Sequence, residues 1–331
     1  MNEANGSTAV PRTASEQALR ATAAIREQIG KALIGQAEAV DQVLIALLAG
    51  GHVLIEGVPG LGKTLLVRAL AKTFNGSFAR IQFTPDLMPA DVTGHTLYDQ
   101  ATRQFTTRRG PVFTNLLLAD EINRAPAKTQ AALLEVMQEG QVTIEGVAHA
   151  LAPPFMVLAT QNPIEQEGTY ALPEAQLDRF LLKIRIDFPD HEDEHRMVRQ
   201  VTHNQVGDRL NVEQVGTLLA PEAVLTLQRF VASLTVDERV SDYAVRVARA
   251  TRTWPGISAG ASPRGGISLV RAARAHALIS GRDFVTPDDV KSMALPALRH
   301  RITLAPELEI EGQSTDSVLA TLLGKVEAPR T

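Results

Sequence analysis

A glycine-rich segment from Gly57 to Thr64 carries the most recognisable chemistry in this sequence. It reads GVPGLGKT and matches the pattern G-x-x-x-x-G-K-[ST]. Glycines at these spacings let backbone N–H groups point inward and hold phosphate oxygens at the start of a helix. We expect the Lys63 ammonium to bind the β- and γ-phosphates of a nucleotide, and the Thr64 hydroxyl to bind Mg²⁺. The segment therefore predicts a nucleoside triphosphate site.

An acidic pair at the end of an apolar run provides the second half of such a site. Residues 116–119 read LLLA and are followed by Asp120 and Glu121. We expect Asp120 to bind Mg²⁺, directly or through water, and Glu121 to orient and activate the attacking water. A kinase has to exclude water, whereas a carboxylate beside the metal-binding Asp recruits it. The pair therefore favours nucleotide hydrolysis over phosphoryl transfer to a metabolite.

These motifs need a scaffold in which strands alternate with helices. Residues 52–56 form a short apolar run bounded by glycine, which is typical of a buried strand, and residues 63–74 have helical spacing. Strands that alternate with helices indicate an α/β fold with a doubly wound parallel sheet, covered on both faces. The other expected elements are strands at 78–83, 112–120, 155–160 and 181–186, and helices within 15–48 and at 128–139.

Two polar segments interrupt this alternation and predict hairpins. Residues 96–107 carry a turn at 99–102, and residues 141–151 alternate apolar and polar side chains, so we expect both to project from the core. After residue 189 only helical spacing continues. We therefore predict a flexible tail at 1–14, an α/β nucleotide-binding domain at 15–189 and a smaller, all-helical lid domain at 190–331. The expected lid helices are 191–201, 221–233, 241–252, 267–280 and 287–298.

The composition limits the class of protein. The 331 residues include 33 Lys and Arg against 37 Asp and Glu, a formal net charge of −4, which argues against a dedicated nucleic-acid or anionic-membrane surface. There is no Cys, which excludes disulfides, thiolate metal sites and cysteine nucleophiles. The first residues lack a secretory signal pattern, and no apolar stretch reaches the ~20 residues of a membrane span. We therefore expect a cytoplasmic protein without membrane insertion.

Further landmarks of the sequence resemble the MoxR family of AAA+ ATPases. They occur in the family order and lie between about residues 15 and 310. The resemblance implies a P-loop AAA+ fold with a helical lid, ATP and Mg²⁺ as cofactors, and ATP hydrolysis in a ring, taken as a hexamer. The carrying segments are Ile34-Gly35-Gln36, the phosphate loop, 82–91 (QFTPDLMPAD), 120–130 (DEINRAPAKTQ), 159–163 (ATQNP) and 172–180 (LPEAQLDRF).

The resemblance also implies roles for single residues. Asn162 corresponds to the sensor-1 residue that helps Glu121 position water, and Arg179 to the arginine finger given to the nucleotide of a neighbouring subunit. The alternative for Arg179 is a surface arginine paired with Asp178. Arg264 corresponds to the sensor-2 arginine of the lid, acting on its own or on a neighbouring nucleotide. The expected nucleotide-binding residues are Ile34, Gly35, Gly57, Val58, Pro59, Gly60, Leu61, Gly62, Lys63, Thr64, Leu65, Asp120 and Arg264.

The function that the resemblance implies is chaperone-like remodelling or activation of protein partners, metal-cofactor maturation included. The partners often carry a von Willebrand factor A domain. The alternative is an AAA+ motor that translocates nucleic acid, which the small basic cluster of Arg103, Arg108 and Arg109 around the first hairpin keeps open. Against this alternative stand the acidic charge balance and the aromatic content of 4%.

Two short patterns match catalytic motifs without their structural context. Residues 191–195 read HEDEH, but this segment is polar on every side, so we expect a solvated helix rather than a zinc site. Residues 256–260 read GISAG, but a helical pattern precedes them where a hydrolase needs a strand. We interpret this segment as a loop of the lid.

Overall fold

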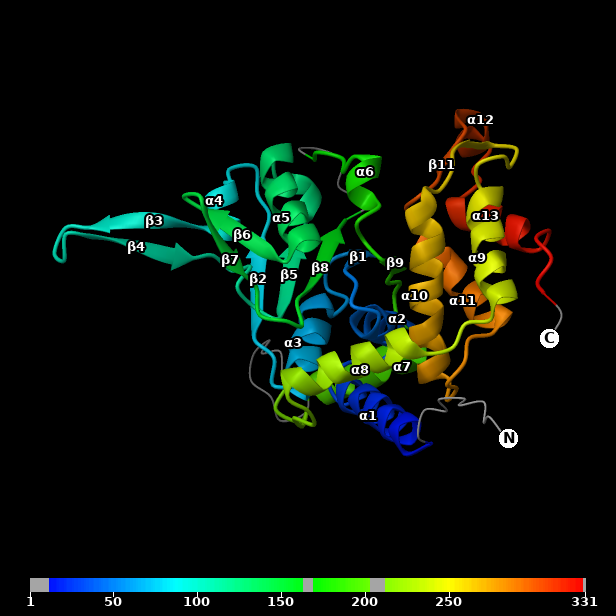
Figure 1. Ribbon diagram of the computed structural model, residues 1–331, viewed down its shortest axis with the longest axis horizontal. Coiled ribbons are helices and arrows are strands. Elements are labelled where there is room, and N and C mark those ends of the chain that lie inside the picture. The colour runs from blue at the N-terminus through cyan, green and yellow to red at the C-terminus, as the bar shows by residue number, and fades with distance from the viewer. Residues whose placement is uncertain (1–11, 163–168, 203–211, 330–331) are drawn as a thin grey trace, which may run out of the picture.

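A parallel five-stranded sheet lies at the centre of the nucleotide-binding domain, in the strand order β2-β5-β8-β1-β9. The computed structural model describes residues 12–162, 169–202 and 212–329 of the chain (Figure 1). The inner strands are buried on both faces, which explains their continuous apolar sequences. The predicted doubly wound sheet is confirmed. Its strands are β1 (Val53–Glu56), β2 (Phe78–Gln82), β5 (Leu116–Asp120), β8 (Met156–Gln161) and β9 (Leu182–Arg185).

Two hydrophobic clusters cover the two faces of the sheet. Alternate residues of β1 divide between them: Val53 and Ile55 belong to the first cluster, and Leu54 belongs to the second. This is the period of two that a strand requires. The first cluster includes residues of α1 (Arg12–Gly30), α2 (Ala37–Leu48) and α3 (Lys63–Thr73), and the second includes residues of α4 (Pro89–Thr93), α5 (Ala127–Glu139) and the 3₁₀ turn Ile122–Arg124.

The two hairpins differ in their relation to the core. The first, β3 (Gly94–Asp99) with β4 (Gln104–Arg109), extends away from the molecule and is mostly exposed (Figure 1). The second consists of β6 (Gln141–Ile144) and β7 (Val147–Ala150). Our expectation that it also projects from the core is wrong, because Val142 and Ile144 are buried in the second cluster. Every other side chain of β6 faces that core.

The lid consists of helices packed beside the sheet, with two very short strands (Figure 1). β10 (Ile257–Ala259) pairs with β11 (Thr303–Leu304), a pairing that the sequence pattern did not indicate. Ser258 lies on β10 rather than in the loop we expected, and its hydroxyl donates to the carbonyls of Thr303 and Leu304. The helices are α9 (Glu238–Ala250), α10 (Pro263–Ile279), α11 (Pro287–Leu298), α12 (Pro306–Ile310) and α13 (Thr315–Leu323), and α6 (Glu174–Leu177) precedes β9.

The segment between the sheet and this bundle contacts the nucleotide-binding domain. The Lys72 ammonium on α3 donates to the Val212 carbonyl at 2.7 Å, and the Gln228 amide on α8 (Pro221–Ser233) donates to Leu47 at 2.7 Å. The domain boundary at residue 189 therefore stays a prediction. At the amino end, α1 begins at Arg12, inside the predicted tail, and residues 1–11 lie outside the described residues.

Helix α7 (His191–Thr202) has mostly exposed side chains, as expected for the HEDEH segment. Among the described residues, no group of three or more His, Asp or Glu is arranged to hold a metal ion. Pro163 of the ATQNP landmark falls outside the described residues. In the part of the chain that the structure describes, no helix has both the length and the apolarity to cross a bilayer.

His52 joins three elements at the start of β1. Its Nδ1 accepts a hydrogen bond from the Val157 N–H of β8 at 3.0 Å, and its Nε2 is 3.0 Å from the Met137 carbonyl at the end of α5. One nitrogen accepts and the other donates, so the ring is neutral. Burial lowers the pKa of His52 from 6.5 to about 4.

This geometry predicts acid-sensitive stability. The unfolded chain takes up a proton on His52 below pH 6.5, whereas the folded chain does so only near its lowered pKa of about 4. The free energy of unfolding should therefore fall by up to about 1.4 kcal/mol per pH unit as the pH drops through this window. His52→Gln, which keeps one donor and one acceptor, should flatten that dependence in urea unfolding. Equal pH slopes for the two proteins would remove His52 from this role.

Candidate nucleotide site

The phosphate loop connects β1 to α3 in a backbone shape that only glycine allows without strain. Gly60 and Gly62 have φ angles of +89° and +78°. A Cβ on Gly57 would lie 2.6 Å from the Ile186 carbonyl oxygen, so a larger residue does not fit there. No side chain caps the amino end of α3, whose N-cap residue is Gly62. The first N–H groups of this helix therefore remain available for phosphate oxygens.

Lys63 is the first residue of α3 and points back over the loop. Its ammonium donates to the Gly57 carbonyl at 2.5 Å. Burial lowers the pKa of Lys63, and the negative charges of Asp120 and Glu121 oppose that shift. The ammonium therefore lies close enough to both carboxylates to be affected by their negative charge. In this position it can also bind phosphate oxygens.

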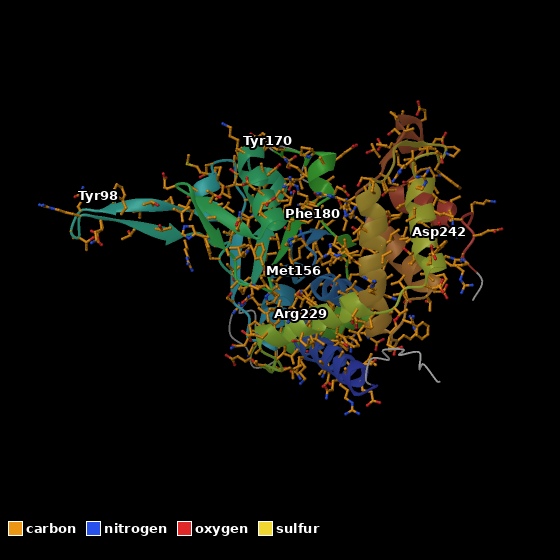
Figure 2. The ribbon with its side chains drawn as sticks, viewed as in Figure 1. Tyr98, Met156, Tyr170, Phe180, Arg229 and Asp242 are labelled. Atoms are coloured by element: carbon orange, nitrogen blue, oxygen red, sulfur yellow. The ribbon has the colours of Figure 1, made fainter. Side chains whose placement is uncertain are left out.

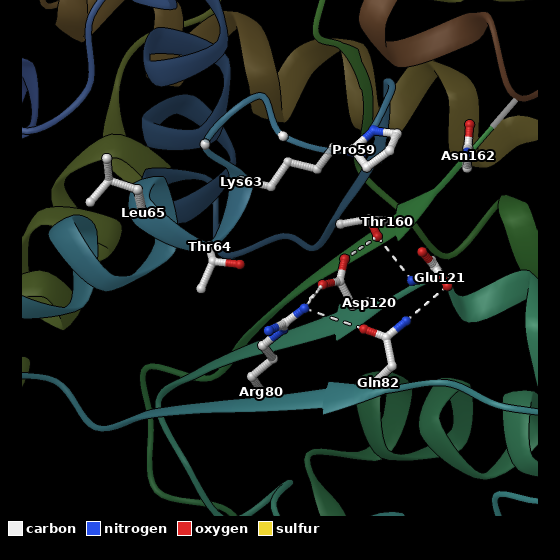
Figure 3. Close-up of a pocket in the computed structure, with 12 residues that line it drawn as sticks. Pro59, Lys63, Thr64, Leu65, Arg80, Gln82, Asp120, Glu121, Thr160 and Asn162 are labelled. Carbon is white, nitrogen blue, oxygen red and sulfur yellow. Dashed lines mark hydrogen bonds and ion pairs between the residues drawn. The ribbon is translucent and has the colours of Figure 1, made fainter. Parts of the chain in front are cut away.

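A cavity of about 270 Å³ opens between the loop and the carboxyl ends of the strands (Figure 3). The structure brings five expected site residues together in its wall, and they come from α3 and from the ends of two neighbouring parallel strands, β5 and β8. This convergence follows from the shared polarity of the strands. These five residues are Lys63, Thr64, Asp120, Glu121 and Asn162, and Pro59, Gly60, Gly62 and Leu65 complete the loop side.

The two acids are held differently. Asp120 accepts the Thr160 hydroxyl at 2.6 Å and forms an ion pair with Arg80 at 2.7 Å. Thr64 and Asp120 offer a hydroxyl and a carboxylate oxygen to the same cavity, a donor set that suits Mg²⁺. On binding Mg²⁺, the Asp120 carboxylate would give up its ion pair with Arg80.

Glu121 has a left-handed backbone, with φ +55°, which is uncommon for a residue other than glycine and is found at functional sites. Its carboxylate accepts from the Gln82 amide at 2.8 Å and from Arg124 at 3.0 Å. Its backbone N–H donates to the Thr160 hydroxyl at 2.9 Å, which fixes the turn after β5 (Figure 3).

Sequence reasoning assigned no role to Arg80, Gln82 or Thr160, although all three contact the acids. Arg80 and Gln82 are two residues apart on β2, so their side chains share one face of an edge strand. The sequence did contain a signal for these contacts. Arg80 and Gln82 are two polar residues at strand spacing, on the strand beside the one that ends in the acidic pair.

A second cavity of about 310 Å³ contains Arg179 and Arg264, and neither lines the first one. It is also lined by Gly51, His52 and Arg271, so it lies at the start of β1, whereas the phosphate loop follows the end of that strand. The pairing of Arg179 with Asp178 that we considered does not occur among the described residues. Asp178 pairs with Arg301 instead.

The remaining expected nucleotide-binding residues do not line the first cavity. Gly57 and Val58 line a third cavity together with Phe188. Leu61 packs against the first hydrophobic cluster, which is where an apolar side chain of the loop is stable. Ile34 and Gly35 line none of these cavities, and a Cβ on Gly35 would lie 2.8 Å from the Pro189 Cβ.

Comparisons with known proteins agree with this architecture. Residues 52–182 match the model of the ATPase family associated with various cellular activities (AAA), and residues 249–322 match the AAA lid domain. The chain is 43% identical to Chaperone MoxR1 of Mycobacterium tuberculosis over 92% of this chain and 81% of that protein. The chain belongs to the MoxR family of AAA+ ATPases. MoxR of Methylorubrum extorquens is 32% identical over 93% of this chain and 95% of its own length.

The resemblance to MoxR proteins extends to uncharacterised relatives and to the fold. YeaC of Bacillus subtilis is 45% identical over 92% of this chain and 93% of that protein. The solved structure of a proposed ATPase from Cytophaga hutchinsonii superposes with a TM-score of 0.88 at 43% identity, covering 96% of this chain and 99% of the other. The α/β P-loop fold with a helical lid is therefore that of the MoxR family.

The phosphate-loop geometry predicts the effect of removing the Lys63 ammonium. Lys63→Ala should abolish ATP binding, since the positive charge that attracts the phosphates is lost. The measurement is equilibrium binding of a fluorescent ATP analogue. Lys128→Ala, which removes an exposed lysine from α5, is the matched control and should bind normally. Tight ATP binding by Lys63→Ala would show that we have misinterpreted the loop.

Proposed function

We propose that this protein is a Mg²⁺-dependent ATPase that works as a ring, taken as a hexamer, and remodels or activates protein partners in the cytoplasm. The observation that carries the proposal is the division of the charged machinery between two cavities. Lys63, Thr64 and the acids line one, and Arg179 and Arg264 line the other. One subunit therefore holds two halves of an active site that do not meet.

The strand between the two cavities explains why a second subunit is needed. β1 has four residues, which at ~3.3 Å per residue separate its two ends by about 13 Å before the flanking loops are added. Arg179 precedes β9, which runs parallel to β1, and so belongs to the start of the strands. In a ring, the Arg179 cavity of one subunit would face the phosphate loop of the next, and Arg264 would act in the same direction.

Each group then has a defined task in hydrolysis. Lys63 and the first N–H groups of α3 would hold the phosphates, and Thr64 and Asp120 would hold Mg²⁺, which would neutralise phosphate charge when bound. Glu121 accepts a proton from the attacking water, which the Asn162 amide helps to orient. Arg179 of the neighbour stabilises the charge that develops on the transferred phosphoryl group, an effect worth a factor of about 10³ or more in other systems.

The projecting hairpin supports a protein client. It exposes Leu97, Tyr98 and Phe105, and the ring centroids of Tyr98 and Phe105 are 5.1 Å apart. Figure 2 shows Tyr98 on this hairpin. Apolar side chains held away from the body of the protein suit contacts with another polypeptide. The name of Chaperone MoxR1 agrees with this role. Partners with a von Willebrand factor A domain are proposed from the family resemblance. Metal-cofactor maturation is proposed on the same basis. The name of a more distant relative, the Magnesium-chelatase 38 kDa subunit, supports it, at 28% identity over 65% of this chain.

A nucleic-acid motor is the second candidate, because the same hairpin carries exposed Arg103, Arg108 and Arg109 beside its aromatic residues. Cations interleaved with aromatic rings bind single strands. The net charge of −4 opposes this function.

Glu121→Gln should separate binding from hydrolysis. It keeps the size of the side chain but removes the proton acceptor, so ATP should bind normally while kcat falls by a factor of about 10² to 10⁴. Glu135→Gln, an exposed change on α5, is the control and should hydrolyse ATP at the normal rate. Near-normal turnover by Glu121→Gln would exclude Glu121 from water activation.

The same variant tests the client. Glu121→Gln loaded with ATP and Mg²⁺ is recovered from nuclease-treated lysate and compared with Lys63→Ala. Specific retained proteins, above all one with a von Willebrand factor A domain, support remodelling. Retention of nucleic acid that appears only without nuclease would favour the motor.

Arg179→Ala should bind ATP but lose activity. Mixing it with Glu121→Gln subunits should restore part of the activity, because the latter offer an intact Arg179 to the phosphate loop of the former. Arg229→Ala, an exposed change on α8, should remain fully active. Absence of rescue at every mixing ratio would contradict a finger that acts on the neighbouring subunit.

A further inference from the structure

Arg301, which follows α11, is an almost fully buried arginine at the wall of the second cavity. Its side chain is 2% exposed. Its N–H groups donate to the Asp178 carboxylate at 2.7 Å, to the Phe180 carbonyl at 2.5 Å and to the Leu181 carbonyl at 3.2 Å. These acceptors lie on both sides of Arg179 in the chain. One guanidinium of the lid therefore holds the whole turn from which Arg179 projects.

The Asp178 carboxylate connects the same turn to the helix that carries Arg264. One oxygen accepts from Arg301, and the other accepts from the Ser262 hydroxyl at 2.7 Å. Ser262 is the N-cap of α10, and its hydroxyl also accepts the backbone N–H of Arg264 at 3.1 Å. A short chain of hydrogen bonds thus runs from the residue before Arg179 to the backbone of Arg264.

The electrostatics make this arrangement specific. Burial lowers the pKa of Arg301, the Asp178 charge opposes the shift, and the nearby Arg264 charge lowers the pKa further. A buried guanidinium needs a carboxylate and well-aligned acceptors to compensate for its lost hydration. Here those acceptors include the backbone and side chain of the Arg179 turn as well as the Ala297 carbonyl and the Ser268 hydroxyl of the lid. The guanidinium therefore joins the lid, through Ser268, to the turn that precedes β9, through Phe180 (Figure 2, where Phe180 marks the turn).

We propose that Arg301, through Asp178, is a positioning residue that holds Arg179 and Arg264 as one rigid unit aimed at the nucleotide of the neighbouring subunit. The proposal rests on the ring function argued above. Arg301 does not touch the nucleotide in this account. It fixes the two arginines that do, so that movement of the lid and movement of the finger are one event.

Arg301→Gln tests the proposal in the assembled protein. A misplacement of about 1 Å at a reacting centre can cost about 100-fold in rate, so we expect kcat to fall by that order while the Kd for a fluorescent ADP stays within about twofold. Glu121→Gln subunits should rescue the variant on mixing. In an Arg179→Ala background, Arg301→Gln should cause less than about a threefold further loss, since it acts through a residue already absent.

Arg299→Gln is the matched control. Arg299 is also a buried arginine of the lid, with a side chain 8% exposed, but it pairs with Asp316 and not with Asp178. It should keep a normal kcat. If Arg301→Gln does not fold, the isosteric Asp178→Asn removes the same ion pair from the other side and should show the same loss of kcat and the same rescue.

Three results would overturn the proposal: a normal kcat in folded Arg301→Gln, a loss of ADP affinity in proportion to the loss of kcat, or failure of Glu121→Gln to rescue it. The last result counts against Arg301 alone when Arg179→Ala is rescued in parallel. If Arg179→Ala retains normal activity, the ring function itself is contradicted.

Discussion

The direction of β1 is the constraint on which the rest of the site depends. The phosphate loop leaves the carboxyl end of this strand, and the cavity of Arg179 begins beside His52 at its amino end. Because all five strands are parallel, Asp120 and Asn162 arrive at the same edge as the loop, and no local adjustment brings Arg179 there. The sheet thus brings the expected phosphate and metal ligands together, and in our proposal the finger comes from another subunit.

The lid contacts the part of the subunit that contains Arg179, at the amino end of β1. Its buried contact between Arg301 and Asp178 holds the turn that leads into β9, at the end of the sheet opposite the phosphate loop. A second set of charges connects the lid to the nucleotide side, where Arg185 on β9 pairs both with Asp316 of α13 and with Glu56, the residue before the phosphate loop. The lid therefore contacts both ends of β9.

Local sequence was sufficient for the features that depend on short spacing. The phosphate loop, the acidic pair and the alternating elements occupy consecutive residues, so their pattern predicted the sheet and the residues that meet in the first cavity. Features that depend on partners far apart in the sequence were not predicted. Val142 and Ile144 are buried only because the second core lies against β6, β10 finds β11 across the whole of α10 and α11, and Asp178 meets a partner 123 residues away. The placement of Arg264 with Arg179 rather than with Lys63 likewise follows from the packing of the lid, which no spacing in α10 reveals.

The central claim is that a neighbouring subunit completes each nucleotide site, and one structure tests it directly. Glu121→Gln assembled with ATP and Mg²⁺ would be imaged by electron cryomicroscopy. We predict a closed ring in which the γ-phosphate held by Lys63 of one subunit is contacted by Arg179 and Arg264 of the next. A γ-phosphate contacted only by residues of its own subunit, in a monomer or in a ring, would contradict it.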